Sequence, residues 1–379
     1  MKASDIFHIL KRVALHYETT DRQKINYAMA RNFLNDHKLP PLTEAEKREI
    51  DDYWRQYGVK WPDYTWFQMY YGITGYHTPR FIPSGILSPV IYKYYNYQDD
   101  ICRWDDKNIY EMMNPVANFP KSLAHKMLGR FYDSGYHYRA NTDESLDALA
   151  ANIFELLEGD TDIILKVSKK SFAGKGVKKF TGIESAKDIK KILTEQEAPN
   201  YVLQKCVRQH PFFRQFCSTS VNILRIISWR HDDTVSLFSA SLRYGIEGSF
   251  TDCAFVCDKE IVYVVVVDAN GRINDRFVTY DGNMEKPPDI SDKQVPSWKE
   301  LTATVMKAHE RMFFFDIIGW DFTIDDQGKP VCIEYNILRP GTILYQFCNG
   351  PFAGEYTEQF LEFLKSHKDM IPKYLRYKP

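Results

Sequence analysis

The most informative segment of this chain is GWDFTIDDQGKPVCIEYN, residues 319–336. Polar and apolar residues alternate with a period of two on both sides of residues 326–329, which is the pattern of two strands joined by a turn. With the turn centred in the middle of those four residues, Asp321 lies directly across from Glu334, about 5 Å away at Cβ. Asn336 points to the same side as Glu334, because strand residues two apart share a face.

This facing pair of acids has two interpretations. Two carboxylates and one amide oxygen on one patch suit Mg²⁺, which takes one or two carboxylates plus the phosphates of a nucleotide. The competing interpretation is a solvated hairpin face, because opposed acids on exposed strands cost only about a few tenths of a kcal/mol. The hairpin alone leaves both open, and the rest of the chain decides between them.

Composition describes an ordinary soluble protein. The 379 residues are too many for one small core and indicate two or three packed units. The chain is 44% hydrophobic and 26% charged, with a formal net charge of −1 and a pI near 6.8. Without a basic surface, nucleic acid and anionic membranes are not expected as main partners.

Targeting and redox signals point to the cytoplasm. The first residues mix charges into every turn and lack the apolar core of a signal peptide. The most apolar run, 261–267, is far too short to cross a bilayer, so no membrane insertion is expected. The seven cysteines include no C-x-x-C pair and read as reduced, buried thiols.

The order of elements indicates an α+β fold. Thr43 and Glu46 form a capping box in a largely helical N-terminal region, and residues 61–104 are unusually aromatic. These rings either pack the helices onto the remainder of the chain or present a face to a ring-shaped substrate. From residue 162 onward strands dominate and helices intervene. We expect strands at 163–167, 201–207, 220–229, 235–244, 261–267, 319–325 and 331–336, and helices at 145–158, 186–193, 298–313 and 356–366.

Lys166 interrupts the apolar strand 163–167, where a lysine must reach an anion or extend to water. The basic loop 168–177 comes directly after it, and its glycines allow backbone N–H groups to approach phosphate oxygens. The loop lacks the G-x-x-x-x-G-K-[ST] pattern, and an ordinary hairpin turn also explains it.

Two arginines lie on neighbouring expected strands. Arg225 interrupts an apolar run, and Arg243 ends the polar face Ser239-x-Ser241-x-Arg243. Their guanidinium groups could bind a phosphate or carboxylate through two hydrogen bonds, or form structural ion pairs.

Together these residues resemble the ATP-grasp superfamily, and most closely its sugar-transfer-associated family. The resemblance covers roughly residues 45–365. Its most specific part is the hairpin of acids followed by Pro340-Gly341, and the thirteen-residue gap between Asp321 and Glu334 is similar to that of D-alanine–D-alanine-ligase-like enzymes. Further matches are Asp106-Lys107-Asn108, Lys166 with its glycine loop, and Asn222-x-x-Arg225.

The resemblance implies an ATP-grasp fold, in which two α+β lobes enclose Mg·ATP, here with a helical N-terminal region. We expect a helical, aromatic-rich region at 1–100, the small lobe and linker at 101–207, and the large lobe at 208–379. The resemblance also implies a role for each site residue. Lys107 and Lys166 are expected to contact phosphates, and a loop with Ser171, Gly174 and Gly176 to close over them. The hinge, with Gln204, Lys205 and Val207, is expected to hold the adenine through its backbone. Magnesium is expected to be ligated by Asp321, Glu334 and Asn336, and the transferring group to be stabilised by Arg225 and Arg243.

Three positions depart from the family pattern. Gly319 stands where D-alanine-ligase-like enzymes have an arginine, and Gln204 stands where the hinge usually has an acid. The acid that binds the ribose has no clear counterpart after Val207, although Gln209 or His210 could serve.

By resemblance the protein is an ATP-dependent, ADP-forming carboxylate–amine ligase that acts through an acyl-phosphate. The family's association with surface polysaccharides suggests a sugar and an amino acid as the small-molecule substrates. A kinase acting on a sugar or other hydroxyl is the first alternative, and a nucleotide-sensing or scaffold protein is the second.

Overall fold

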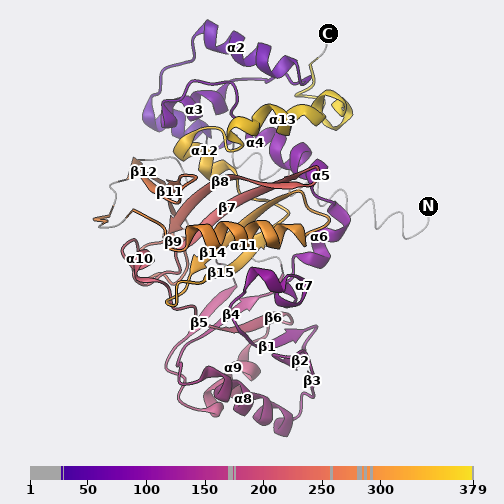
Figure 1. The fold of residues 1–379 in the computed structure, drawn as a ribbon, viewed down its shortest axis with the longest axis vertical. Helices are drawn as coiled ribbons and strands as arrows, with labels where there is room; N and C mark the ends of the chain where they lie inside the picture. Colours follow the sequence, from indigo (N-terminus) through magenta and orange to yellow (C-terminus); the bar gives the residue numbers. More distant parts are fainter. Residues whose placement is uncertain are drawn as a thin grey trace, which may run out of the picture.

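The computed structural model describes residues 27–28, 30–169, 174, 176–256, 259–279, 284–285, 288–290 and 293–377. Two large antiparallel sheets follow one another along the long axis of the molecule (Figure 1). Helices from both ends of the chain lie at one end, the seven-stranded sheet lies in the middle, and the six-stranded sheet lies at the other end. Mixed helices and antiparallel sheets confirm the α+β prediction.

The six-stranded sheet has the order β3-β2-β1-β6-β4-β5. One face packs on two helices, and Leu149, Ile153 and Leu165 belong to the core between them. The first helix begins where Thr142 caps it by accepting a hydrogen bond from the N–H of Ser145. The bounds are β1 Ser122–Met127, β2 Arg130–Asp133, β3 Tyr138–Arg139, β4 Ile163–Val167, β5 Val177–Phe180, β6 Tyr201–Lys205, α8 Asp143–Leu157 and α9 Ala186–Glu195.

The seven-stranded sheet has the order β13-β12-β11-β8-β7-β14-β15. Helix α11 covers one face, where Leu301 and Val305 share a core with Leu224 and Trp320. Strands β9 and β10 form a separate two-stranded sheet and lie between β8 and β11 in the sequence. The bounds are β7 Ile223–His231, β8 Thr234–Tyr244, β9 Ala254–Val256, β10 Lys259–Ile261, β11 Tyr263–Val267, β12 Ile273–Thr279, β13 Met284–Glu285, β14 Ile317–Ile324, β15 Pro330–Asn336 and α11 Trp298–Glu310.

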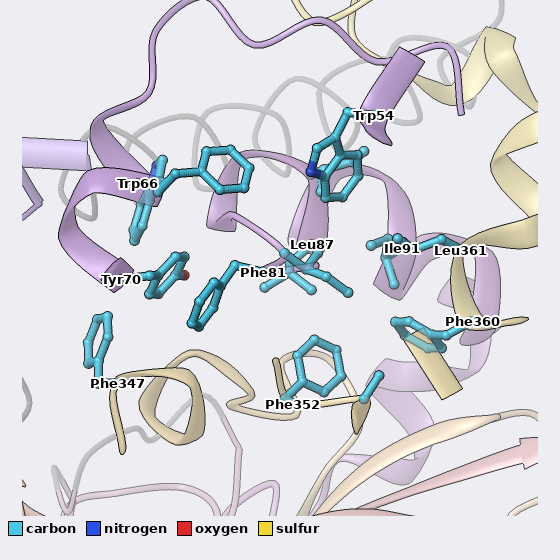
Figure 2. Packing of buried hydrophobic residues seen from close by; sticks show 14 of the residues in the cluster. Trp54, Trp66, Tyr70, Phe81, Leu87, Ile91, Phe347, Phe352, Phe360 and Leu361 are labelled. Carbon is cyan, nitrogen blue, oxygen red and sulfur yellow. The ribbon is translucent and has the colours of Figure 1, made fainter. Parts of the chain in front are cut away.

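The aromatic N-terminal segment packs against the C-terminal helices and against the face of the seven-stranded sheet that α11 does not cover. Figure 2 shows Tyr70 and Phe81 beside Phe347 and Phe352, and the rings of Tyr70 and Phe81 stack at 4.7 Å. Packing, the first of the two interpretations of residues 61–104, is therefore correct for most of these rings. The helices are α2 Glu44–Arg55, α3 Thr65–Thr74, α4 Ser84–Ile86, α5 Tyr92–Tyr95, α6 Gln98–Trp104, α7 Tyr110–Met113, α10 Pro211–Arg214, α12 Ile343–Asn349 and α13 Thr357–Leu361, with a π-helical turn at Leu87–Ile91 and 3-10 turns at Pro115–Ala117, Gly354–Tyr356, Glu362–Lys365 and Lys368–Met370.

A short connection joins the two sheets. Strand β6 ends at Lys205 in the six-stranded sheet, and Gln209 already forms a bridge with Asp325 at the end of β14. Residues 206–208 therefore connect the two sheets and overlap the predicted hinge 204–207, of which Gln204 and Lys205 lie in β6.

The described residues contain neither a helix that could span a membrane nor a disulfide bond. Among the described residues, no helix combines the length and the apolarity needed to cross a bilayer. The six described cysteines are all free thiols. Four of them are buried as predicted, whereas Cys102 is exposed and Cys206 is half-buried.

Candidate active site

Strands β14 and β15 form the predicted hairpin and pair its two acidic residues as expected. Asp321 on β14 lies opposite Glu334 on β15, and Gly319 lies opposite Asn336. The turn, however, is centred on residue 327, since Ile324 pairs with Pro330. A β-bulge beside Asp321 adds one extra residue to β15, and this shift restores the pairing of the two acids.

Arg225 lies on the other side of Asp321, because β7 pairs with β14 and places these residues in register. Its Nε donates to Asp321 Oδ1 at 2.5 Å, and its Nη2 donates to Oδ2 at 2.8 Å. Asp321 is only 2% exposed. Burial alone raises the pKa of Asp321, but the charge and hydrogen bonds of Arg225 outweigh it and hold that pKa below its usual value. Asp321 is therefore an ionised, fixed carboxylate.

Glu334 and Asn336 complete the set of oxygen donors. The Glu334 side chain is 31% exposed and lies 3.4 Å from Lys107 Nζ. Asn336 Nδ2 donates to Asp321 Oδ2 at 3.2 Å, and a half-turn of this amide places its oxygen there instead. Among the described residues, no group of three or more His, Cys, Asp or Glu side chains could hold a metal. Two carboxylates and an amide suit Mg²⁺, which completes its shell with water and phosphate.

Two lysines converge on this hairpin from other segments. Lys166 on β4 crosses from the six-stranded sheet, and its Nζ donates to the carbonyl of Ile333, the extra residue of the bulge, at 3.5 Å. Burial lowers the pKa of Lys166 to about 8, although Glu334 acts to raise it. Lys107 is held nearby, because its backbone N–H donates to Ser168 O, just after β4.

The glycine loop reaches the seven-stranded lobe. Gly174 and Gly176 both have positive φ angles, +73° and +80°, which favour glycine. A Cβ on Gly174 would lie 3.1 Å from Thr251 Oγ1, so the loop contacts the segment that follows β8. Ser171 lies outside the described residues.

In the link between the lobes, side chains are already hydrogen-bonded or ion-paired, whereas part of the backbone is not. Gln204 is buried and donates to Pro120 O at 3.1 Å, and Lys205 Nζ pairs with Glu158 at 2.6 Å. Cys206 and Val207 make no backbone hydrogen bond to the part of the chain that the structure describes. Their peptide groups are thus available to a ligand.

Gln209 and His210 have structural roles. Gln209 Nε2 donates to Asn222 O at 2.7 Å and to Thr323 Oγ1 at 2.6 Å. His210 caps α10 by accepting from the N–H of Phe212. Neither side chain is therefore a good candidate for binding a ribose.

The structure explains the glycine at position 319. A Cβ at position 319 would lie 2.0 Å from Pro340 O. This carbonyl oxygen accepts a hydrogen bond from Arg225 Nη1 at 3.0 Å. Gly341, with φ +82°, packs directly on the same guanidinium group. An arginine at 319 is sterically excluded, and Arg225 on the next strand contacts Asp321 instead.

Arg243 has a partner that the sequence reasoning missed. Its Nη2 lies 2.5 Å from Asp252 Oδ2, and its Nη1 lies 4.0 Å from Asp321 Oδ1. Burial raises the pKa of Asp252 to about 6, even though Arg243 acts to lower it. Asp252 lies in a loop without periodicity or motif, so only the folded arrangement identifies it.

Comparison with known proteins identifies a family. The sequence profile described as "Sugar-transfer associated ATP-grasp" matches residues 92–360. No curated protein matches.

Solved structures that match include three enzymes. D-alanyl-alanine synthetase A from Vibrio cholerae O1 biovar eltor is 13% identical with a TM-score of 0.40, and covers 71% of this chain and 66% of its own. The D-alanine-D-alanine ligase from Coxiella burnetii is 8% identical with a TM-score of 0.38, covering 72% and 60%. N5-carboxyaminoimidazole synthase from Aspergillus clavatus, in complex with ADP, is 12% identical with a TM-score of 0.37, covering 71% and 54%. The chain spans about half to two thirds of the length of these structures, and the likeness concerns the fold alone.

Proposed function

The chain belongs to the sugar-transfer-associated ATP-grasp family, and we propose that it is an ATP-dependent, ADP-forming carboxylate–amine ligase. ATP phosphorylates a substrate carboxylate, and an amine then displaces phosphate from the acyl-phosphate. We further propose a sugar acid as the carboxylate, because the family description names sugar transfer, and an amino acid as the amine.

The single observation that supports this proposal most is the reach of Lys166 to the hairpin. Lys166 comes from one sheet and Asp321 and Glu334 from the other, yet the lysine lies 3.5 Å from the carbonyl that precedes Glu334. Acids that hold a cation and lysines that hold phosphates must meet in this way if a nucleotide lies between the lobes.

The proposed roles rest on these contacts. Asp321, Glu334 and Asn336 would hold magnesium, which supplies charge neutralisation for the phosphates when bound. Arg225 fixes Asp321, since it donates three hydrogen bonds to protein oxygens. Arg243 is the better candidate to contact the transferring group, because its Nε is buried without a hydrogen-bond partner among the described residues. The backbone of residues 206–207 would hold the adenine.

Isotope transfer tests the ligase chemistry. With ¹⁸O in the acceptor carboxylate, one label should appear in the released phosphate, because the carboxylate oxygen that attacked ATP leaves with it. Turnover that releases only unlabelled phosphate refutes the acyl-phosphate route. A stable phosphorylated product without free phosphate identifies a kinase instead.

The pKa of Lys166 predicts how ATP binding depends on pH. Only the ammonium form attracts phosphate, and burial lowers the pKa of this lysine to about 8 in the free protein. Above pH 8 each bound ATP must therefore be accompanied by proton uptake, and affinity should fall by up to about tenfold per pH unit. Lys166→Met should bind ATP more weakly and with little pH dependence. Titration of Mg·ATP binding between pH 7 and pH 9.5 measures both, and a parallel decline in the variant would contradict the assignment.

Gly174→Ala should weaken closure of the loop. Alanine is strained at φ +73°, by about 1 kcal/mol, and its Cβ would crowd Thr251. We expect the KM for ATP to rise about fivefold, with an unchanged melting temperature. Gly182→Ala is the matched control, because its φ is +69° and a Cβ there meets nothing within 4 Å. Equal effects of both changes on KM would show that loop closure does not depend on Gly174.

A further inference from the structure

Two buried polar atoms near Asp321 have no hydrogen-bond partner in the described part of the chain. They are Arg243 Nε and Asp252 Oδ2, the second of which contacts the Arg243 guanidinium as an ion pair without hydrogen-bond geometry. Asp252 is 8% exposed, and the side chain of Arg243 is 12% exposed. Buried polar atoms rarely lack a hydrogen bond, so two of them on neighbouring side chains indicate a ligand.

These atoms share the face of the sheet that carries the metal acids. Ser241 on β8 pairs in register with Arg225, which pairs with Asp321. Arg243 lies two residues from Ser241 on the same strand and therefore points the same way. Asp252 lies on the segment 245–253 that follows β8, and approaches Arg243 from beyond the end of the strand.

Asp252 lies between two parts of the proposed nucleotide site. Arg243 separates it from Asp321, with contacts of 2.5 Å to Asp252 and 4.0 Å to Asp321. On its other side, the neighbouring residue Thr251 contacts Gly174 of the glycine loop. Asp252 thus lies between the loop expected over the phosphates and the acids expected at the metal.

We infer that Asp252 and Arg243 form the subsite for the attacking substrate, a primary amine, an inference that rests on the proposed ligase function. Asp252 Oδ2 accepts an N–H from the amine, and Arg243 Nε donates to the acyl-phosphate. The nitrogen attacks the acyl carbon, the C–N bond forms and the C–O bond to phosphate breaks. One proton of the amine leaves with the phosphate, and the extra proton of the ammonium form passes to water. A carboxylate at this position attracts an ammonium group and repels an anionic nucleophile.

Hydroxylamine separates this subsite from the first half of the reaction. It is small and uncharged at neutral pH, and traps an acyl-phosphate as a hydroxamate without needing a carboxylate to hold it. With Mg·ATP, uronic acids as carboxylates and amino acids as amines, Asp252→Asn should raise the KM for the amine about 10- to 100-fold. Hydroxamate formation by the same variant should fall much less than amide formation, because Arg243 keeps its contact with Asp321.

Matched variants exclude a loss of folding. Asp133→Asn removes the charge of another buried aspartate that lies 2.5 Å from an arginine, the half-exposed Arg139 of the six-stranded sheet, and should leave the KM for the amine unchanged. Should Asp252→Asn not fold, Asp252→Glu keeps the charge but displaces it, and the same split between amide and hydroxamate is expected. An equal fall of both products, or no change in either, overturns the inference. If wild-type protein forms neither product, the proposed ligase function fails first and the subsite with it.

Discussion

Asp321→Ala should lower ATP-dependent turnover by about 1000-fold and destabilise the folded protein by about 3–5 kcal/mol. The first effect follows from the loss of a carboxylate proposed to hold the metal. The second follows because Arg225, which is 9% exposed and paired with Asp321 through two hydrogen bonds, would become a buried charge without its partner. ADP release and denaturant unfolding measure the two effects separately.

Glu334→Gln is the matched control for this prediction. Glu334 lies directly opposite Asp321, but its side chain is 31% exposed and pairs with a lysine at 3.4 Å. Turnover should fall to a similar degree, whereas stability should fall by less than in Asp321→Ala, because the glutamine amide oxygen can still accept a hydrogen bond from Lys107. Full activity in either variant would show that the pair of acids has no role in the reaction.

Gly319→Ala should have the second largest effect, on stability and turnover together. Its Cβ would lie 2.0 Å from Pro340 O, a backbone atom that cannot move away alone. Overpacking of this kind costs about 1–3 kcal/mol. The displaced turn would also lose its hydrogen bond from Arg225, which orients Asp321. We expect turnover to fall about 100-fold.

Unfolding and ADP-release assays compare Gly319→Ala with the control variant Gly85→Ala. A Cβ on Gly85 would have its nearest contact at 3.8 Å, so this change should be nearly neutral. Gly319→Arg, which reproduces the arginine of D-alanine-ligase-like enzymes, should be even less active than the alanine variant. A gain of activity in Gly319→Arg would contradict the steric explanation.

The predicted strands correspond to seven of the fifteen strands in the described part of the chain, including those that carry the candidate site. The strand 163–167 and the pairing of Asp321 with Glu334 are confirmed, because alternation around a turn leaves few registers that bury the apolar side. Eight strands were not predicted, namely β1, β2, β3, β5, β9, β10, β12 and β13. The exposed or mixed residues of β5, for example, carry no clear period.

The site was predictable where its residues interrupt an apolar pattern, as Lys166 and Arg225 do. Contacts between distant segments were not predictable. The bulge at Ile333 is invisible to a pattern that assumes strict alternation, and it decides where Lys166 finds an acceptor. The pairing of Arg243 with Asp252 depends on how a loop folds back, for which the intervening residues give no signal.

A crystal structure with magnesium and a non-hydrolysable ATP analogue tests most directly whether the opposed acids form a metal site. We expect Mg²⁺ about 2.1 Å from oxygens of both Asp321 and Glu334, with the phosphates within hydrogen-bond distance of Lys166. Nucleotide bound elsewhere, or a metal held by the phosphates with neither acid in contact, would contradict the central claim.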